Sequence, residues 1–351
     1  MTIDSLSRSE LSETIRQGAH DAGFQLVGIA PAVTPPGFAR FRDWLERGFA
    51  GEMKWIERRL DAYEDPTMVL PSVRSVVMVG LNYGSDEPVE LRPGQGRISR
   101  YAWNECDYHA IVRDKLKKVV SRVREVAPKV RTRVVVDTAP LLERDFGKLA
   151  GLGWFGKNTL LINKYQGSWL FLGAMLLDCE LDYDQPHETS HCGTCTRCLD
   201  ACPTNAFPEP FVLDATKCIS YLNIELRDQP IPEPLRAGMG EWVFGCDICQ
   251  DVCPWNRKAP MDNREFAPRD DMNPVNCESL LQMDEPEFKE RFAGTPLERT
   301  GRDTIARNAA IVLGNMDCGT EALADVAQSH ESLLVRDAAR WALGRHAEQS
   351  E

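Results

Sequence analysis

The cysteine run in the middle of the chain constrains the fold more than any other feature. The stretch "HCGTCTRCLDACP" (191–203) brings Cys192, Cys195, Cys198 and Cys202 close together and ends in proline. This C-x2-C-x2-C-x3-C-P spacing is the bacterial ferredoxin pattern for 4Fe-4S clusters. Three thiolates on one loop can bind three irons of one cube, whereas the cysteine before the proline ligates a second cube. The chain must therefore supply further cysteines for two clusters.

A second cysteine run supplies these ligands. The stretch "CDICQDVCPW" (246–255) has a second Cys-Pro pair, and one further cysteine stands alone between the two runs. In ferredoxins the cysteine that precedes proline is exchanged between the two clusters. We therefore assign one cluster to Cys192, Cys195, Cys198 and Cys253, and the other to Cys202, Cys218, Cys246 and Cys249.

Structural zinc is the alternative, because zinc sites also use four thiolates at C-x2-C spacing. Zinc does not explain two Cys-Pro endings or a run of three cysteines, so iron–sulfur clusters are favoured. The chain holds 12 cysteines in 351 residues. No signal-peptide pattern opens it and no apolar stretch reaches the roughly 18 residues of a membrane helix, so we expect a cytoplasmic protein with reduced thiols and no membrane contact.

Hydrophobic patterning indicates an α/β (α+β) domain over residues 1–185. Apolar β-type runs there alternate with amphipathic helical stretches. The expected strands are 24–30, 74–83, 130–140 and 168–178, and the expected helices are 9–21 and 108–127. We expect Ser9 to cap the first helix and Gly23 to end it.

The rest of the chain divides into three further expected parts. Residues 186–260 form a ferredoxin-like domain with two 4Fe-4S clusters, and residues 261–298 form a connecting helical segment. Residues 299–351 repeat one amphipathic pattern about 29 residues apart, which aligns Arg307 with Arg336. This repeat predicts a HEAT-like α-helical repeat at the C-terminus.

A glycine-rich stretch in the first domain invites a dinucleotide-site interpretation. Residues 151–159 read "GLGWFGKNT" and contain G-x-G-x-x-G. That fingerprint requires a strand before it and a helix after it, but the helical "LLERDFGKLA" precedes it and the β-like "LLIN" follows. NAD binding is therefore disfavoured, although the glycines still let the backbone approach a large, flat ligand.

Asp137 is the candidate catalytic residue, because iron–sulfur clusters pass electrons and bond-making chemistry is expected in the α/β domain. It follows three valines at the C-terminal tip of an expected buried strand, the edge where ligands bind in α/β sheets. An aspartate before "TAP" can equally cap the next helix. The residues alone leave both interpretations open.

Several motifs, in order along the chain, resemble the epoxyqueuosine reductase family, which completes queuosine synthesis in tRNA. They are "VVVDTAPLLERDFGKLAGLGWFGKNTLLI", "CGTCTRCLDACPTNAF", "CISYLNIEL" and "GCDICQDVCPWNR". Shorter matches are "GEMKW" (51–55), "SRYA" (99–102) and "DYH" (107–109). The resemblance implies reductive deoxygenation of epoxyqueuosine to queuosine at the wobble position of the tRNAs for Asp, Asn, His and Tyr.

The resemblance also implies cobalamin, bound between the α/β and ferredoxin-like domains and reduced through the two clusters. Asp137 matches the family's proton donor. The cobalamin contacts carried over are Arg100, Asp137, Gly153, Trp154, Lys157, Asn158, Leu161 and Leu172. Two departures affect this pocket: Tyr63 stands where relatives have an arginine, and Cys106 lies in a segment one residue longer than usual.

The expected partners are the tRNA anticodon stem-loop with epoxyqueuosine and a low-potential electron donor of unknown identity, and the chain is expected to be a monomer. A net charge of −12 argues against a general nucleic-acid coat, so tRNA must be met by local basic groups. The candidates are Arg113, Lys115, Lys117, Lys118, Arg122, Arg124, Arg302, Arg307, Arg336, Arg340 and Arg345. Two alternative functions are a corrinoid iron–sulfur reductase of a small organic electrophile, as in dehalogenases, and a non-catalytic ferredoxin-type electron carrier.

Overall fold

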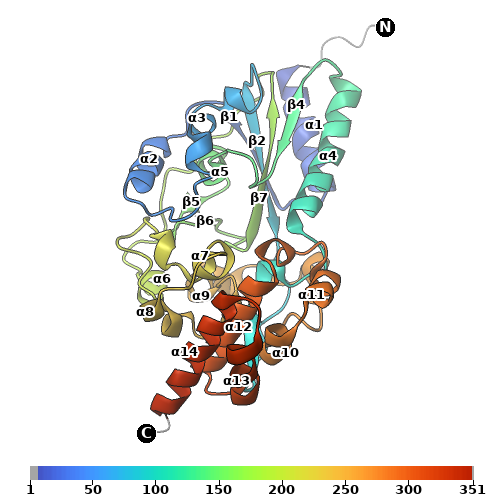
Figure 1. The fold of residues 1–351 in the computed structure, drawn as a ribbon. Coiled ribbons are helices and arrows are strands. Elements are labelled where there is room, and N and C mark those ends of the chain that lie inside the picture. The colour runs from blue at the N-terminus through green and yellow to red at the C-terminus, as the bar shows by residue number, and fades with distance from the viewer. Residues whose placement is uncertain (1–6, 350–351) are drawn as a thin grey trace.

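A four-stranded sheet forms one end of the molecule (Figure 1) in the computed structural model, which describes residues 7–349. The strand order is β1-β2-β7-β4, and every neighbouring pair is antiparallel. The strands are β1 (Leu26–Pro31), β2 (Ser75–Asn82), β7 (Leu170–Leu177) and β4 (Thr132–Val135). The expected strands are confirmed, but the ligand-edge rule that singled out Asp137 belongs to parallel sheets and does not apply here.

The strand before Asp137 was expected to be buried, and that expectation is wrong. β4 lies at the edge of the sheet, and Val135 is the one fully buried residue of the strand. Valine favours any half-buried pleated surface, so a valine run does not distinguish an edge strand from a central one. Asp137 therefore leaves the sheet at its open edge.

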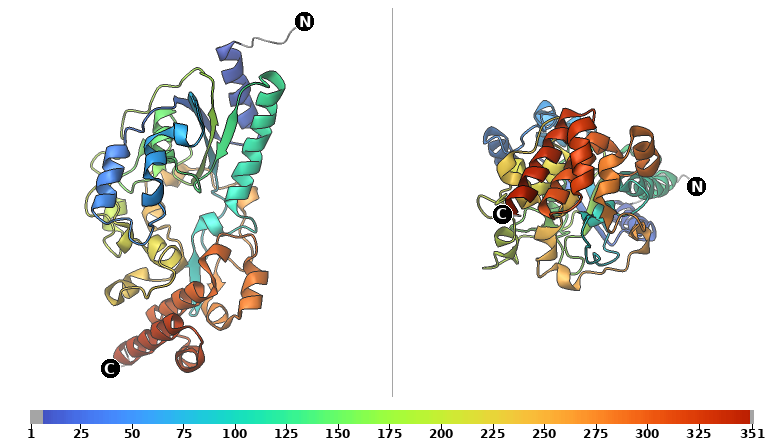
Figure 2. Two further views of the ribbon diagram at one scale, coloured as in Figure 1. Left: turned by 45° about the horizontal axis from the view of Figure 1, so that its top comes forward. Right: turned by 60° about the horizontal axis from the view of Figure 1, so that its bottom comes forward.

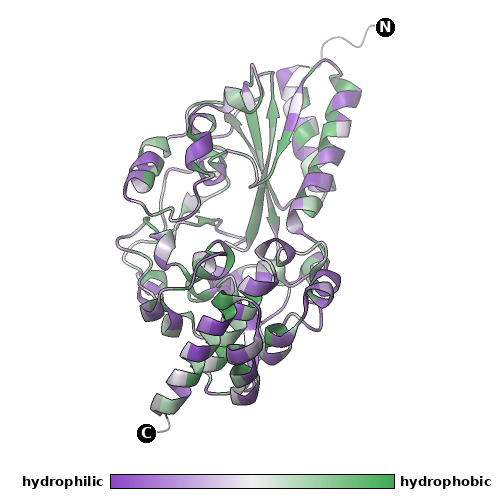
Figure 3. Cartoon of the chain, viewed as in Figure 1, coloured by the Kyte–Doolittle hydropathy of each residue, from purple (hydrophilic) through white to green (hydrophobic). Residues whose placement is uncertain are grey.

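Helices cover both faces of this sheet. They are α1 (Arg8–Asp21) and α4 (Tyr108–Val126) on one face and α5 (Glu143–Leu149) on the other. Alternate residues of β2 pack into the two separate cores, so the whole strand is buried. Figure 3 shows the green apolar strands between helices that carry purple polar residues.

The first helix starts earlier than its sequence pattern predicts. Ser7, not Ser9, caps α1: its hydroxyl accepts a hydrogen bond from the Glu10 N–H, and the Glu10 carboxylate accepts one from the Ser7 N–H. This reciprocal capping box satisfies two N–H groups that have no partner within the helix. Gly23 follows the helix with a φ of +93°, as expected.

A second sheet joins distant parts of the chain. Its order is β8-β3-β9, with β3 (Gln95–Ile98) parallel to β8 (Trp242–Phe244) and antiparallel to β9 (Val275–Asn276). Ile98 and Trp103 share one core with the C-terminal helices. The segment 95–103 therefore leaves the first sheet and packs with residues more than a hundred positions later.

The C-terminal region is helical. Its helices are α10 (Cys277–Gln282), α11 (Glu285–Phe292), α12 (Arg302–Asn315), α13 (Thr320–Ser329) and α14 (Leu333–Gln349). Figure 2 shows these orange and red helices at the end of the molecule opposite the first sheet. The two Ala-Ala pairs that align in the sequence repeat, 309–310 and 338–339, are all buried, and α12 packs along α14.

The cysteine runs lie between the two sheets, in loops with short helices. These helices are α6 (Arg197–Asp200), α7 (Ile219–Ile224), α8 (Glu233–Arg236) and α9 (Ile248–Asp251). The remaining elements are α2 (Phe38–Glu46), α3 (Leu60–Glu64), β5 (Trp154–Phe155) and β6 (Leu161–Ile162). Within residues 7–349, none of the helices is long and apolar enough to cross a membrane.

Candidate active site and cluster-binding loops

The first group of thiols comes from both cysteine runs. Burial and the charges of Cys253, Cys192 and Cys195 together raise the pKa of Cys198 to about 11. Cys253, some fifty residues away in sequence, therefore lies beside the three cysteines of the first run. Cys253 receives hydrogen bonds from two main-chain N–H groups, those of Trp255 and Asn256.

The second group lies deeper in the protein. Burial holds the pKa of Cys249 well above its ordinary value, and Cys218, Cys198 and Cys202 add to this through their charges. Burial also raises the pKa of Cys246 well above its ordinary value, and the charges of Cys249 and Cys218 add to this. Main-chain N–H groups again point at sulfur, because Ala206 donates to Cys202 at 3.4 Å. The interaction of Cys249 with Cys198 shows that the two groups are neighbours.

The cysteines are not gathered around a single ion. Among residues 7–349, no three His, Cys, Asp or Glu side chains lie close enough together to hold one metal ion. A zinc ion bonds sulfur at roughly 2.3 Å and needs its ligands in contact with one another.

Three of the residues expected to touch cobalamin also contact the cysteine loops. The Lys157 ammonium donates to the carbonyls of Gly193 at 2.8 Å and Cys195 at 2.9 Å, and the Asn158 amide donates to the carbonyl of Cys249 at 3.2 Å. Trp154 is 1% exposed and packs with Cys253 and Cys192. These side chains tie the glycine-rich loop to both cysteine runs.

Three other expected cobalamin contacts pack within the first domain. A Cβ on Gly153 would lie 2.1 Å from the Ile162 carbonyl oxygen, so only glycine fits the β5–β6 hairpin. Leu161 is buried against α5, and Leu172 lies half-buried at the edge of the same core. The G-x-G-x-x-G stretch thus joins α5 to a hairpin, which confirms that it lacks the strand–loop–helix context of a dinucleotide site.

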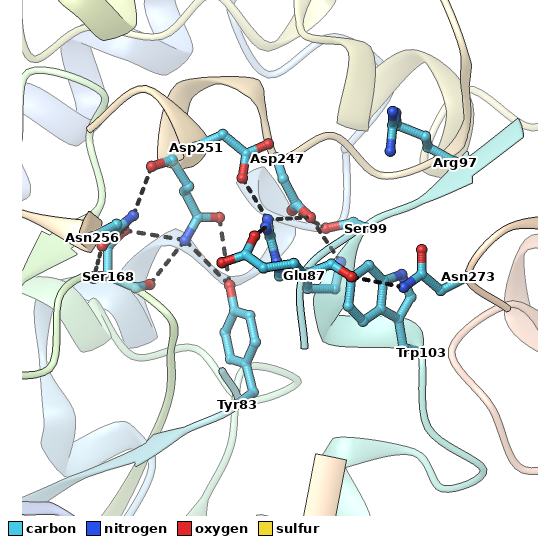
Figure 4. A network of polar contacts seen from close by, with 12 residues as sticks. Tyr83, Glu87, Arg97, Ser99, Trp103, Ser168, Asp247, Asp251, Asn256 and Asn273 are labelled. Atoms are coloured by element: carbon cyan, nitrogen blue, oxygen red, sulfur yellow. Dashed lines mark hydrogen bonds and ion pairs between the residues drawn. The ribbon is translucent and has the colours of Figure 1, made fainter. Parts of the chain in front are cut away.

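Arg100 is buried in an ionic network, whose acidic members Glu87, Asp247 and Asp251 are labelled in Figure 4. Its guanidinium is 4% exposed, donates to Asp251 and Glu87, and lies 3.7 Å from Asp247. It also lies over the Trp169 ring at 4.5 Å. These contacts link the "SRYA" segment to the second cysteine run and satisfy the charge of Arg100 within the protein. A cavity of about 530 Å³ lies alongside.

Asp137 sits in a turn directly after β4, with its side chain 40% exposed. Its two carboxylate oxygens accept hydrogen bonds from the Tyr108 hydroxyl and the His109 Nε2–H, both at the start of α4. Burial, together with the charge of Asp137, holds the pKa of Tyr108 well above its ordinary value, so this hydroxyl keeps its proton and donates. Asp137 is therefore a partly exposed carboxylate with two fixed hydrogen-bond partners.

Sequence reasoning missed the partners of Asp137. His109 is 6% exposed, and its Nδ1 faces both Asp107 and the Arg299 guanidinium, the latter at 3.2 Å. Arg299 also pairs with Asp107 at 3.2 Å. The "DYH" motif was the available signal, but nothing in the sequence brings Arg299 to it.

The two departures from the family pattern lie near this site. Tyr63 is buried and packs against the Phe41 ring, with ring centroids 5.1 Å apart. Cys106 is exposed, one residue before Asp107. On the same side, Arg59 donates to the Thr138 carbonyl at 3.0 Å, which anchors the turn that carries Asp137.

Comparisons with known proteins agree with this arrangement. The family "Epoxyqueuosine reductase QueG, DUF1730" matches residues 64–138, and the "4Fe-4S double cluster binding domain" matches residues 191–256. The epoxyqueuosine reductase of Xanthomonas campestris pv. campestris is 40% identical over 346 residues, which cover 96% of this chain and 97% of the relative. The chain belongs to the epoxyqueuosine reductase family. This confirms the family resemblance seen in the sequence motifs.

Solved structures of epoxyqueuosine reductases share the fold. One crystal structure, with an epoxyqueuosine-modified tRNA-Tyr stem loop, has a TM-score of 0.89 at 28% identity and covers 97% of this chain and 91% of its own. The enzyme from Bacillus subtilis has the same values, in a structure described as having its Asp catalytic loop swung out of the active site. The double-cluster match encloses the seven cysteines of the two runs and Cys218 between them, and the other family match ends just after Asp137.

Proposed function

We propose that this protein reduces epoxyqueuosine to queuosine in tRNA. The reaction removes the epoxide oxygen as water and takes two electrons and two protons. Family membership, at 40% identity over 96% of the chain, carries the proposal. The relative solved with an epoxyqueuosine-modified tRNA stem loop supports tRNA as the substrate.

The proposed cluster ligands are the two groups of cysteines described above. The donor set fits 4Fe-4S clusters, because each group offers four thiols and main-chain N–H groups point at the sulfurs. The sets are Cys192, Cys195, Cys198 and Cys253, and Cys202, Cys218, Cys246 and Cys249. The first run is partly exposed, which supports entry of electrons there from an external low-potential donor.

Cobalamin is the proposed second cofactor; when bound, its reduced cobalt is a strong nucleophile toward carbon. The site fits a ligand, because the buried Glu143 Oε1 has no partner among the described residues and its charge interacts with the accessible Asp137. Asp137, Leu161 and Leu172 would contact the cofactor from the sheet. The other proposed contacts, which also hold or adjoin the cysteine loops, are Arg100, Gly153, Trp154, Lys157 and Asn158.

Asp137 is the proposed proton donor. Tyr108 and His109 hold both of its oxygens, and Arg59 fixes the neighbouring carbonyl, so the carboxyl is oriented before substrate arrives. Asp137 gives its proton to the epoxide oxygen as the first C–O bond breaks. The Asp catalytic loop named for the Bacillus subtilis enzyme supports this role.

Exposed cations on α4 are the proposed contacts to tRNA phosphates. Arg113, Lys118 and Arg124 are exposed, whereas Lys115 pairs with Glu265 and Arg122 with Asp21. The helices α12–α14 would form the proposed HEAT-like platform. Arg307 cannot reach a phosphate, because it is 1% exposed and donates to buried main-chain carbonyls.

We further propose that the protein is a cytoplasmic monomer and that each of the four parts expected from the sequence has its own role. Residues 1–185 would bind cobalamin and substrate, residues 186–260 would bind the clusters, residues 261–298 would connect, and residues 299–351 would support the tRNA. The segment 95–103 would couple the first of these parts to the last, since it belongs to the second sheet and the C-terminal core.

The test is nucleoside analysis of epoxyqueuosine tRNA after incubation with the reduced, cobalamin-loaded protein. We expect queuosine from the wild type and at least roughly a 100-fold loss in Asp137→Asn, which removes a general acid. The variant should retain about eight irons, as two cubes require, and should still bind cobalamin. Turnover of an organic halide without queuosine would favour the dehalogenase-like alternative, and failure to bind any corrinoid would favour the electron carrier.

A further inference from the structure

The proposed reaction needs more protons than Asp137 can hold. Opening the first C–O bond of the epoxide leaves an alkoxide that takes one proton. Breaking the second C–O bond releases the hydroxyl as water, which takes another. A carboxyl group carries one proton, so a second proton must reach Asp137 after it has given the first.

His109 is in direct contact with Asp137. Its Nε2 lies against Asp137 Oδ1, and its ring stacks on the Tyr108 ring with centroids 4.0 Å apart. The ring is 6% exposed, so it exchanges protons through its hydrogen-bond partners rather than directly with bulk water. His109 is therefore placed to pass a proton to Asp137.

Charged groups fix which way the imidazole faces. Asp107 Oδ1 contacts Nδ1, and the Arg299 guanidinium, which lies 3.2 Å from the same nitrogen, also pairs with Asp107. Glu143, at the start of α5, interacts with His109 through its charge. Burial favours neutral Asp107, but hydrogen bonds from His109 outweigh it and keep the pKa of Asp107 below its ordinary value. Asp107 thus accepts from Nδ1–H, which leaves Nε2–H for Asp137.

The balance of these contacts favours the imidazolium. Burial by itself lowers the pKa of His109, but its hydrogen bonds to Asp107 and Asp137 raise the pKa above its ordinary value. The ring therefore keeps its second proton to higher pH than a free imidazole does, with Nε2–H facing Asp137 and Nδ1–H bound to Asp107.

We propose that His109 is the second proton store of this site and, through its contact, the positioning residue of Asp137; this inference rests on the proposed function. Asp137 protonates the alkoxide, and the Nε2–H of His109 then passes to Asp137 Oδ1. Asp137 gives this second proton to the departing hydroxyl, which leaves as water. The bound clusters would supply the two electrons that, with these two protons, balance the formation of alkene and water. The neutral His109 regains its proton from solvent through the partly exposed Asp107.

Histidine NMR tests the pairing without turnover. The chain has 6 histidines, so the ring signals can be assigned, with His109→Gln identifying that of His109. We expect the His109 titration midpoint to lie above the ordinary value of about 6.5 for histidine, and to fall in Asp137→Asn and in Asp107→Asn. A midpoint that does not respond to Asp137→Asn overturns the proposal.

Single-turnover queuosine formation tests the proton store. His109→Gln keeps an amide donor for Asp137 but cannot release a proton, so we expect roughly a 100-fold slower reaction and no loss of rate as pH rises through the His109 midpoint. In Asp107→Asn, the rate should still fall as pH rises, but at a lower pH than in the wild type. This variant tests the proton store independently of whether His109→Gln folds. His20→Gln is the matched control. A wild-type rate and pH profile in His109→Gln refutes the store, whereas absence of queuosine from both wild type and His20→Gln refutes the proposed function.

Discussion

Lys157 links two loops that lie far apart in sequence. Its ammonium donates to two carbonyls of the first cysteine run, at 2.8 and 2.9 Å. Hydrogen bonds to a charged group contribute about 1.5–3 kcal/mol each. At the scale of a single residue, the two hydrogen bonds of Lys157 hold the glycine-rich loop against that cysteine run.

Lys157→Met is therefore expected to loosen the first cysteine loop. The substitution keeps the apolar stem and removes both hydrogen bonds, so iron should be released to a chelator several-fold faster than from the wild type. Lys164→Met is the control, because Lys164 is exposed beside the Tyr165 ring. Equal rates of iron release in Lys157→Met and the control would show that these bonds do not hold the loop.

Glu143 predicts a pH dependence of stability. Burial, with the charge of Asp137, raises the pKa of Glu143 from 4.5 to about 8. The folded state then binds more protons than the unfolded state between these values, so the free energy of unfolding falls as pH rises through this window. The loss is at most about 1.4 kcal/mol per pH unit. Urea unfolding at several pH values should show this fall in the wild type and a flatter curve in Glu143→Gln; identical slopes would contradict it.

At the scale of elements, β3 depends on the absence of a side chain at Gly96. A Cβ there would lie 2.6 Å from Val243 Cγ2 and 2.8 Å from Cys277 Sγ, both closer than contact distance. These neighbours belong to β8 and α10, so the glycine allows three segments from distant parts of the chain to pack.

Gly96→Ala is expected to destabilise the second sheet by about 1–3 kcal/mol, the usual cost of overpacking. Gly344→Ala is the matched control, because Gly344 lies within α14 and no atom lies near its added Cβ. That control should stabilise the protein by about 0.5–1 kcal/mol through helix propensity. Thermal unfolding of the two variants should show shifts of opposite sign, and a shift of the same sign would refute the packing argument.

At the scale of the whole molecule, a chain with net charge −12 must bind a polyanion through a local surface. Exposed cations on α4 lie on the helix that begins at Tyr108 and His109, so phosphate contacts there would also lie near Asp137. Acidic surface elsewhere would repel tRNA and limit the ways in which it can dock.

Binding of tRNA should therefore weaken steeply with salt. The double variant Arg113→Glu with Lys118→Glu should lower the slope of log affinity against log salt by roughly one for each lost phosphate contact. Arg8→Glu, at the far end of α1, is the control and should leave the slope unchanged. An unchanged slope in the double variant would place the tRNA on another surface.

The sequence by itself determined the elements and the cluster domain. Cysteine spacing indicated the double-cluster domain, and hydrophobic periodicity located the four strands of the first sheet and the two long helices that cover it. These signals depend on residues close together in the chain, where backbone geometry fixes which side chains share a loop or a face.

Only the tertiary structure decided which elements and side chains that are distant in the sequence contact one another. It made the first sheet antiparallel, placed β4 at the edge and β3 in the second sheet, and brought Trp154, Lys157 and Asn158 against the cysteine loops. It also brought Arg299 to Asp107 and His109 across almost two hundred residues. No local pattern encodes such a contact, because its energy comes from packing between elements that the chain joins only through long connections.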